Sequence, residues 1–204
     1  MDAARPIRTL FPLFLKLEGR KCLIVGAGKV GESKVASLLD TGALLHIVAP
    51  RATSRIRTWA RNGQVRWRKR NFRDSDLTGC FLVVGATPSR TLHERIFRLA
   101  KRRNIICNVV DVPELCDFYY PAIVQRGALQ IAVSTGGESP ALAQRIRKQL
   151  ESQFGPEYEE WIRHLGKERQ RIRAQTTPGP RLNKRLHRMA SGASFRKFLQ
   201  SHKK

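Results

Sequence analysis

The amino-acid sequence predicts an α/β fold: a doubly wound parallel sheet, followed by a small α+β unit and a helical C-terminal region. In the first half of the chain, short apolar runs alternate with stretches of helical spacing, which is typical of parallel strands joined by crossover helices. A glycine-rich turn directly follows the first of these runs. After Asp111 the pattern changes to shorter strand-like runs and then to long charged stretches.

The first half supplies five predicted strands and three predicted helices. The run from Lys21 to Val25 is apolar after its first residues and ends at Gly26, as expected for a buried parallel strand. The connections are short, and the order of the elements predicts a Rossmann-like sheet. The predicted strands are 21–25, 43–49, 64–67, 81–84 and 105–110, and the predicted helices are 30–39, 54–61 and 91–103.

The second half is predicted to be a smaller unit followed by charged helices. Strands are expected at 118–121 and 129–133, and Pro140 predicts the start of a helix over 141–154. A charged helix at 157–174, a linker at 176–180 and a basic, partly helical segment at 181–204 follow. We therefore expect three parts, which are residues 1–112, 113–150 and 151–204.

The net charge is the unusual feature of the composition. The 204 residues carry a formal net charge of +23, which makes nucleic acid the first candidate partner. The basic residues are spread along the whole chain, however, and no familiar nucleic-acid-binding motif is present. We therefore expect no nucleic-acid partner, and consider a polyanionic small substrate or a solvated surface instead.

Cysteine usage and hydropathy favour a cytoplasmic protein. The four cysteines form no CxxC pair and no close Cys/His cluster, which argues against a disulfide framework or a zinc site. The five histidines form no metal-ligand pattern, so no metal site is predicted. No apolar run approaches the roughly 20 residues of a membrane-spanning helix. The apolar run at 10–17 is interrupted by Pro12 and precedes no small-residue cleavage site, which argues against a signal peptide.

The turn Gly26-Ala27-Gly28-Lys29-Val30-Gly31 has the spacing G-x-G-x-x-G between a predicted strand and a predicted helix. In this context the first glycine allows a tight turn, the second lets the backbone approach a pyrophosphate, and the third lets helix and strand pack closely. The helix N-terminus adds N–H groups and a partial positive charge. The turn predicts a bound dinucleotide, and the alternative is a glycine-rich turn that binds nothing.

The acidic residue that usually follows the second strand and holds the ribose hydroxyls is absent. The strand ends instead at Val48-Ala49-Pro50-Arg51. Arg51 could face a 2′-phosphate, which would favour NADP, or could be solvated. Small residues at Gly85-Ala86-Thr87 end the fourth strand, where a cofactor can lie across the sheet edge, although a plain turn explains them almost as well.

Asp111 follows the fifth strand, within the run Asn108-Val109-Val110-Asp111. Ligands of open α/β sheets lie at the carboxyl ends of the strands, so a carboxylate there is a candidate proton acceptor in a dehydrogenation. A strand-ending aspartate that caps a turn before Pro113 explains the residue equally well.

Together these segments resemble the precorrin-2 dehydrogenases, the stand-alone enzymes equivalent to the N-terminal half of the fused siroheme synthases. The matching motifs occur in order and at matching spacing, from about Leu10 to about Leu150, with looser similarity through the C-terminal helices. They are the glycine turn at 26–31, Gly85-Ala86-Thr87, 107–111, 116–118, Pro121 and 132–140.

The resemblance implies an activity, which is oxidation of precorrin-2 to sirohydrochlorin in siroheme biosynthesis with NAD as the hydride acceptor. Asp111 matches the aspartate to which catalysis is attributed, as general base. Some members also insert ferrous iron, which would make iron a further substrate and the chain a ferrochelatase, a lyase. Members are homodimers, and the central α+β segment forms their interface. We therefore expect 1–112 to be the NAD-binding domain, 113–150 the dimerisation and substrate segment, and 151–204 the helical basic region.

The resemblance also assigns contact residues. Its relatives likewise lack the acid after the second strand, which leaves NAD as the expected cofactor and NADP as the alternative. Precorrin-2 is a polycarboxylate, so a positive cleft would attract it, although one ligand does not account for the whole charge of +23. The candidate cofactor-binding residues are Gly26, Gly28, Lys29, Val30, Gly31, Pro50, Arg51, Gly85, Ala86 and Thr87, and the candidate substrate-binding residues are Asn108, Ser134, Thr135, Gly136 and Gly137.

A second interpretation is a dinucleotide-sensing regulator whose basic tail, from Arg181 to Lys204, binds nucleic acid or an acidic partner. Asp111 and the loop from Ser134 to Pro140 favour the enzyme, because a sensor needs neither.

Overall fold

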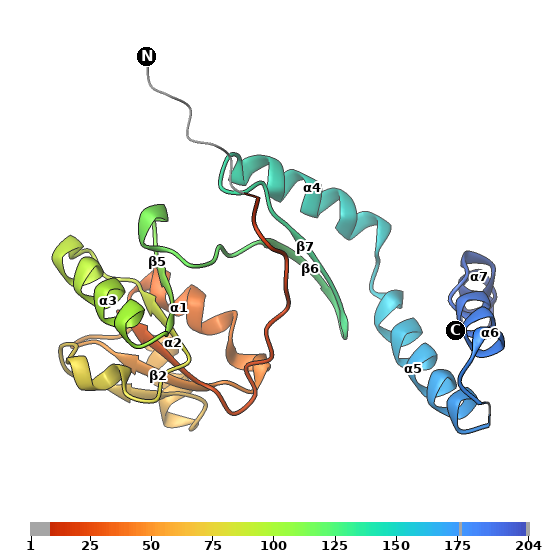
Figure 1. Cartoon of the computed structure of the whole chain (residues 1–204), viewed down its shortest axis with the longest axis horizontal. Coiled ribbons are helices and arrows are strands. Elements are labelled where there is room, and N and C mark those ends of the chain that lie inside the picture. The colour runs from red at the N-terminus through yellow and green to blue at the C-terminus, as the bar shows by residue number, and fades with distance from the viewer. Residues whose placement is uncertain (1–8, 176, 203–204) are drawn as a thin grey trace, which may run out of the picture. The chain divides into compact units, whose positions relative to one another are not determined.

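A computed structural model describes residues 9–175 and 177–202 and divides the chain into two compact units, Met1–Tyr119 and Tyr120–Lys204 (Figure 1). The predicted parts 1–112 and 151–204 and the predicted linker therefore include residues that lie outside the described ranges. The first unit contains the parallel sheet, and the second contains a hairpin and the remaining helices.

The sheet of the first unit has five parallel strands in the order β3-β2-β1-β4-β5. This confirms the predicted doubly wound sheet. The order reverses between β1 and β4, and ligands of such sheets bind at that switch point, outside the carboxyl ends of the strands. The strands are β1 (Lys21–Val25), β2 (Leu44–Val48), β3 (Arg66–Arg68), β4 (Leu82–Gly85) and β5 (Ile106–Val109).

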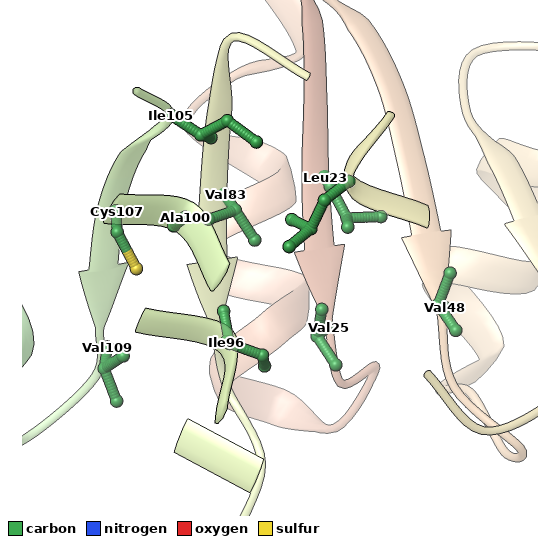
Figure 2. Close-up of a cluster of buried hydrophobic side chains, with 10 residues drawn as sticks. Leu23, Val25, Val48, Val83, Ile96, Ala100, Ile105, Cys107 and Val109 are labelled. Atoms are coloured by element: carbon green, nitrogen blue, oxygen red, sulfur yellow. The ribbon is translucent and has the colours of Figure 1, made fainter. Parts of the chain in front are cut away.

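The two faces of the sheet bury different side chains, because successive residues of a strand point to opposite sides. On one face, Leu23 and Val25 of β1 belong to a buried cluster that includes Ile96 and Ala100 of α3 (Arg90–Arg102) (Figure 2). On the other face lies Ile24, and α1 (Lys29–Ala36) approaches it at Gly31. The remaining helix of this unit is α2 (Ser54–Arg61).

The helix α1 is shorter than the predicted 30–39. Its C-cap is Ser37, whose hydroxyl donates to the Lys34 carbonyl oxygen at 2.8 Å. Such local side-chain hydrogen bonds compete with helix continuation. A short 3₁₀ turn, η1 (Leu39–Thr41), follows, and Gly42 then adopts a φ of 73° as the predicted glycine stop.

The strand predicted at 118–121 is wrong. A tight loop follows β5, passes through η3 (Pro113–Leu115) and returns to the strand; we call 110–118 the return loop. Its end is tied to β5, because the Asp117 N–H donates to the Cys107 carbonyl oxygen at 2.7 Å. The strand forms later, at β6 (Ala122–Arg126), after Pro121.

The second unit begins with an antiparallel hairpin of β6 and β7 (Leu129–Val133). Four helices follow, and aromatic rings join two of them: Trp161 of α5 and Phe198 of α7 have ring centroids 5.0 Å apart, and both are buried. Within the described ranges, no helix combines the length and the hydropathy that crossing a bilayer requires. The helices are α4 (Pro140–Gln153), α5 (Glu157–Gln175), α6 (Pro180–Met189) and α7 (Gly192–Ser201).

Candidate functional site: the carboxyl edge of the parallel sheet

The three glycines of the turn between β1 and α1 differ in what surrounds them. A Cβ atom built on Gly26 would lie 2.1 Å from the Ala86 carbonyl oxygen, and one on Gly31 would lie 2.2 Å from the Gly26 carbonyl oxygen. A Cβ atom on Gly28 meets no described atom within 4 Å. Packing of the protein itself therefore requires glycine at 26 and 31, whereas the space beside Gly28 is open to a ligand.

The helix α1 begins at this open position. Gly28 is its N-cap and provides no side-chain oxygen, so the first N–H groups of the helix depend on another partner. Backbone hydrogen bonds hold the turn in place: the Gly26 N–H donates to Val48 at 3.0 Å, and the Thr53 N–H donates to Ala27 at 3.1 Å. Both Lys29 and Val30 are exposed on the first turn of the helix.

The end of β2 lies beside the glycine turn. Pro50 and Arg51 are exposed there, and the Trp67 indole N–H fixes the segment by donating to the Ala49 carbonyl oxygen at 2.9 Å. The connection to α2 contains no acidic residue, and Arg55 at its end pairs with Glu32 of α1 at 3.7 Å. The exposed Arg51 thus adds a positive charge at the end of the second strand, while Arg55 is paired with a carboxylate.

The end of β4 supplies an unpartnered hydroxyl. The Ala86 N–H donates to Val25 at 2.8 Å and joins this turn to β1. The Thr87 hydroxyl oxygen is buried and has no hydrogen-bond partner in the described part of the chain. Around Gly85 the nearest side-chain atoms are 3.5–3.8 Å from a built Cβ, so packing does not demand glycine there. A bound dinucleotide would give the Thr87 hydroxyl a hydrogen-bond partner and would fill the open space at Gly28.

Asp111 is the second residue of the return loop, exposed and with a φ of 61°. Aspartate tolerates this left-handed conformation better than most residues do. The base of the loop is fixed: the Asp117 carboxylate accepts from the Cys107 N–H at 3.0 Å and pairs with Lys101. Backbone hydrogen bonds flank Asp111 itself, since the Val110 N–H donates to Gly85 at 3.0 Å and the Val112 N–H to Val109 at 3.3 Å. They hold its backbone in place while its side chain stays accessible, which is compatible with a turn residue and with a proton acceptor.

Asn108 is buried, with 6% of its surface exposed. Its side-chain amide donates to the Phe118 carbonyl oxygen at 2.8 Å and to the Cys116 sulfur at 3.3 Å. The Cys116 thiol in turn donates to the Val109 carbonyl oxygen at 3.1 Å. The structure therefore shows Asn108 holding the return loop, and its predicted contact with substrate stays a prediction.

The loop before α4 belongs to the second unit. The hydroxyls of Ser134 and Thr135 accept from the N–H groups of Gly136 and Ser139, both at 3.1 Å. Gly136 and Gly137 have φ values of 65° and 94°, which favour glycine, and no described atom lies within 4 Å of a built Cβ on either. These side chains stabilise the loop and leave the backbone at the two glycines uncovered.

Sequence reasoning missed Lys34. Burial lowers the pKa of its ammonium group, and the negative charge of Asp111 opposes this by raising it. Lys34 is therefore close enough to the return loop for their charges to interact. The signal was present in the sequence, since Lys34 follows Gly31, which packs against the sheet, at a spacing of three residues along α1.

Metal ligands do not gather at this edge. Over the described residues, no three His, Cys, Asp or Glu side chains are close enough to hold a metal ion. Two buried thiols are also poor ligands or nucleophiles, because burial raises the pKa of Cys107 to about 12 and that of Cys22 to about 11.

Comparison with known families identifies the family of the first unit. Residues 13–122, more than half of the chain, match the family described as putative NAD(P)-binding. The chain belongs to this family. A second family, described as sirohaem biosynthesis protein central, matches residues 126–153 in the second unit. The glycine turn, Arg51, Thr87 and Asp111 all lie in the NAD(P)-binding match.

Individual relatives agree with the resemblance drawn from the sequence. The siroheme synthase of Nitrosococcus oceani is 36% identical over 166 residues, 81% of this chain and 36% of the relative. That of Methylococcus capsulatus is 40% identical over 170 residues, 83% of this chain and 36% of the relative. The chain thus spans about a third of the length of these relatives.

A solved structure described as SirC, precorrin-2 dehydrogenase, is similar throughout. It superposes with a TM-score of 0.77 at 27% identity, covering 94% of this chain and 98% of the other. The predicted family resemblance and the predicted fold class are confirmed by these matches.

Proposed function

We propose that this chain is a precorrin-2 dehydrogenase that oxidises precorrin-2 to sirohydrochlorin in siroheme biosynthesis, with NAD as the hydride acceptor. The proposal depends mainly on the positions of the glycine turn and Asp111 in the sheet. The open glycine turn follows β1 and the exposed Asp111 follows β5, and only β4 separates these strands in the sheet. The description of the similar solved structure and the names of the siroheme synthases support the same reaction.

The chain's residues take distinct parts in cofactor binding. The backbone at Gly28 and the first N–H groups of α1, from Lys29 to Gly31, receive the pyrophosphate. The Thr87 hydroxyl offers a hydrogen bond beside the switch point. Pro50 and Arg51 border the adenosine ribose. When bound, the nicotinamide supplies the hydride acceptor.

Asp111 removes the proton. Oxidation of precorrin-2 takes two hydrogens from the macrocycle, one as a hydride with its electron pair and one as a proton. The hydride is transferred to the oxidised cofactor, and a carboxylate oxygen of Asp111 accepts the proton and later releases it to water. Because the return loop fixes the Asp111 backbone, little ordering of this residue is required at the moment of reaction.

The remaining assignments concern the substrate and the assembly. We propose that Asn108 and the loop from Ser134 to Gly137 serve the substrate and that segment 113–150 joins two copies into a homodimer. The helix α4 packs on this hairpin and Val124 of β6 is buried, whereas Ile123, on the opposite face of β6, is 43% exposed, which supports a further partner for that face. Light scattering of the protein in solution would measure its mass. We place the enzyme in the cytoplasm, because of its cysteine usage.

An anaerobic assay tests the reaction. Purified protein receives precorrin-2 and NAD, or NADP in a parallel sample, and absorbance follows reduced cofactor and sirohydrochlorin. Ferrous iron is added last, and siroheme formation at that stage would show the additional chelatase activity.

Asp111→Asn is the decisive variant, since asparagine also accepts the left-handed conformation and so preserves the turn. We expect loss of oxidation with cofactor affinity retained, and Asp40→Asn, at an exposed aspartate of η1, serves as the control. Unchanged turnover in Asp111→Asn would remove this residue from the mechanism. Cofactor binding without any turnover in the wild type would favour the regulator, which the comparisons do not support.

A further inference from the structure

We infer that Lys34 is a positioning residue for Asp111: its ammonium group crosses from α1 to the return loop and holds the carboxylate in place. This inference rests on the proposed function, because it assigns a partner to the proposed base. It names a residue that neither the glycine pattern nor the end of a strand points to.

The first step is the face of the sheet on which Lys34 lies. Gly31 of α1 packs against Gly26 and Ile24, and Val35 is fully buried. Lys34 lies on the same side of α1 as these two residues, and its side chain is half-buried although it ends in a charge. A lysine in this position keeps its charged end beside water or a polar partner, and its stem lies along the sheet surface.

The second step is the row of residues that leads from α1 to the return loop. Ile24 of β1 is paired with Val84 of β4, and Val84 is paired with Asn108 of β5. All three therefore face the side of the sheet that α1 covers. Asn108 donates to the Cys116 sulfur and to the Phe118 carbonyl oxygen, so the return loop wraps around β5 onto this face.

The third step is the direction of the lysine side chain. The helix α1 starts at the carboxyl edge of the sheet, and side chains of a helix tilt toward its N-terminus. Lys34 lies five residues after Lys29, which is about 7.5 Å along the helix axis. Its four-carbon stem thus runs back toward the edge that carries Asp111. The electrostatic interaction of Lys34 with Asp111 agrees with this path.

The inferred role follows from charge and geometry. The Asp111 backbone is fixed by the base of the loop, but its exposed side chain has torsional freedom. A nearby ammonium group restricts the carboxylate to the α1 side of the edge, where the glycine turn begins. Misplacement of a reacting group by about 1 Å can reduce the rate about a hundredfold, so restricting the carboxylate should raise kcat.

Lys34→Met is the main test, with Lys34→Arg as the conservative variant. Methionine keeps an unbranched stem of similar volume and removes the charge. We expect Lys34→Met to lower kcat by roughly ten- to a hundredfold, with KM for precorrin-2 and affinity for NAD nearly unchanged. Lys34→Arg should recover part of kcat. Lys167→Met, at an exposed lysine of α5, is the matched control for losing one positive charge.

A second readout needs no turnover. The N–H groups of Val112, Leu115 and Cys116 donate within the return loop, to Val109, Val112 and Pro113. In Lys34→Met, hydrogen exchange at these amides should become faster, whereas amides of β1 keep their wild-type rates. In an Asp111→Asn background the same substitution should change nothing further, because Lys34 acts through the missing carboxylate.

The possible outcomes distinguish failure of the inference from failure of the proposed function. A wild type that never oxidises precorrin-2 refutes the proposed function, and the exchange experiment then decides the role of Lys34 alone. Wild-type kcat in Lys34→Met overturns the inference. A loss confined to cofactor affinity also overturns it, since Lys34 would then be a cofactor contact. Should Lys34→Met fail to fold, Lys34→Gln is measured in the same two ways.

Discussion

Substituting Gly28 and Gly31 separately should have opposite effects on stability and on cofactor binding. The two glycines lie three residues apart in the same turn, and the G-x-G-x-x-G pattern treats them alike. Their surroundings differ: a Cβ on Gly31 meets the Gly26 carbonyl oxygen at 2.2 Å, whereas a Cβ on Gly28 meets no described atom within 4 Å. Alanine is the smallest substitution that adds this atom.

The magnitudes follow from these distances. A carbon and a carbonyl oxygen normally stay about 3.3 Å or more apart, so Gly31→Ala must move α1 from β1 by roughly 1 Å. Overpacking of this kind costs about 1–3 kcal/mol of unfolding free energy. Gly28 has a φ of −77°, which any residue adopts. Gly28→Ala gains about 0.4–1 kcal/mol by restricting the unfolded chain and loses a similar amount, about 0.5–1 kcal/mol, at the N-cap, so its net effect is near zero.

Cofactor affinity should follow the reverse order. The methyl group of Gly28→Ala occupies the space that the pyrophosphate needs, and we expect at least a tenfold weaker affinity, about 1.4 kcal/mol. Titration of each variant with reduced cofactor, followed by fluorescence, measures this loss. Urea denaturation, or thermal unfolding in which each kcal/mol corresponds to roughly 2–4 °C for a chain of this size, measures stability.

Two results would contradict this reasoning. If Gly28→Ala were destabilised as much as Gly31→Ala, the space beside Gly28 would not be open in the folded protein. If Gly28→Ala bound NAD and NADP as well as the wild type does, the pyrophosphate would lie elsewhere. Gly63→Ala provides a control for strain without ligand contact, because Gly63 has a φ of 73° and open surroundings far along the chain from the turn.

Two further predictions concern buried titratable groups. A hydrogen bond from Arg70 lowers the pKa of the buried Asp76 carboxyl, so this group stabilises the fold above the ordinary pKa of about 3.9 and loses that contribution as the pH falls through its lowered value. Asp76→Asn should therefore cost about 2–3 kcal/mol at pH 7, less than a fully buried pair because Arg70 is partly exposed, and a smaller amount at pH 3, below the ordinary pKa. Equal losses at both pH values in urea denaturation would refute the assignment. Burial raises the pKa of the Cys22 thiol to about 11 and that of the Cys107 thiol to about 12. Both thiols should therefore resist iodoacetamide at pH 8 in the folded protein and react in urea. Equal labelling in both states, measured by mass spectrometry, would contradict their burial.

Much of the first unit could be predicted because its signals are local. Apolar runs of four or five residues predict buried parallel strands, and the glycine at the end of the first run predicts the turn into α1. Capping residues also act locally: Thr53 and Ser89 accept from the backbone N–H groups three residues ahead and begin α2 and α3 within one residue of the predicted starts.

The return loop could not be predicted, because long-range hydrogen bonds decide it. The run Phe118-Tyr119-Tyr120-Pro121 has the aromatic composition of a strand. In the fold, Asp117 and Phe118 bond instead to Cys107 and Asn108, ten residues earlier, and this prevents a strand at that place. Long-range hydrogen bonds here override the strand propensity of the aromatic residues.

For the site, the sequence by itself determined the residue types at each strand end: the glycines, Thr87 and Asp111. It could not distinguish glycines that packing requires from the one that leaves space for a ligand, because that depends on where the Ala86 and Gly26 carbonyl oxygens lie. Nor could it connect Lys34 with Asp111, which are 77 positions apart in the chain. Only the tertiary structure decided these points, because the pairing of β1, β4 and β5 brings α1 and the return loop onto one face of the sheet.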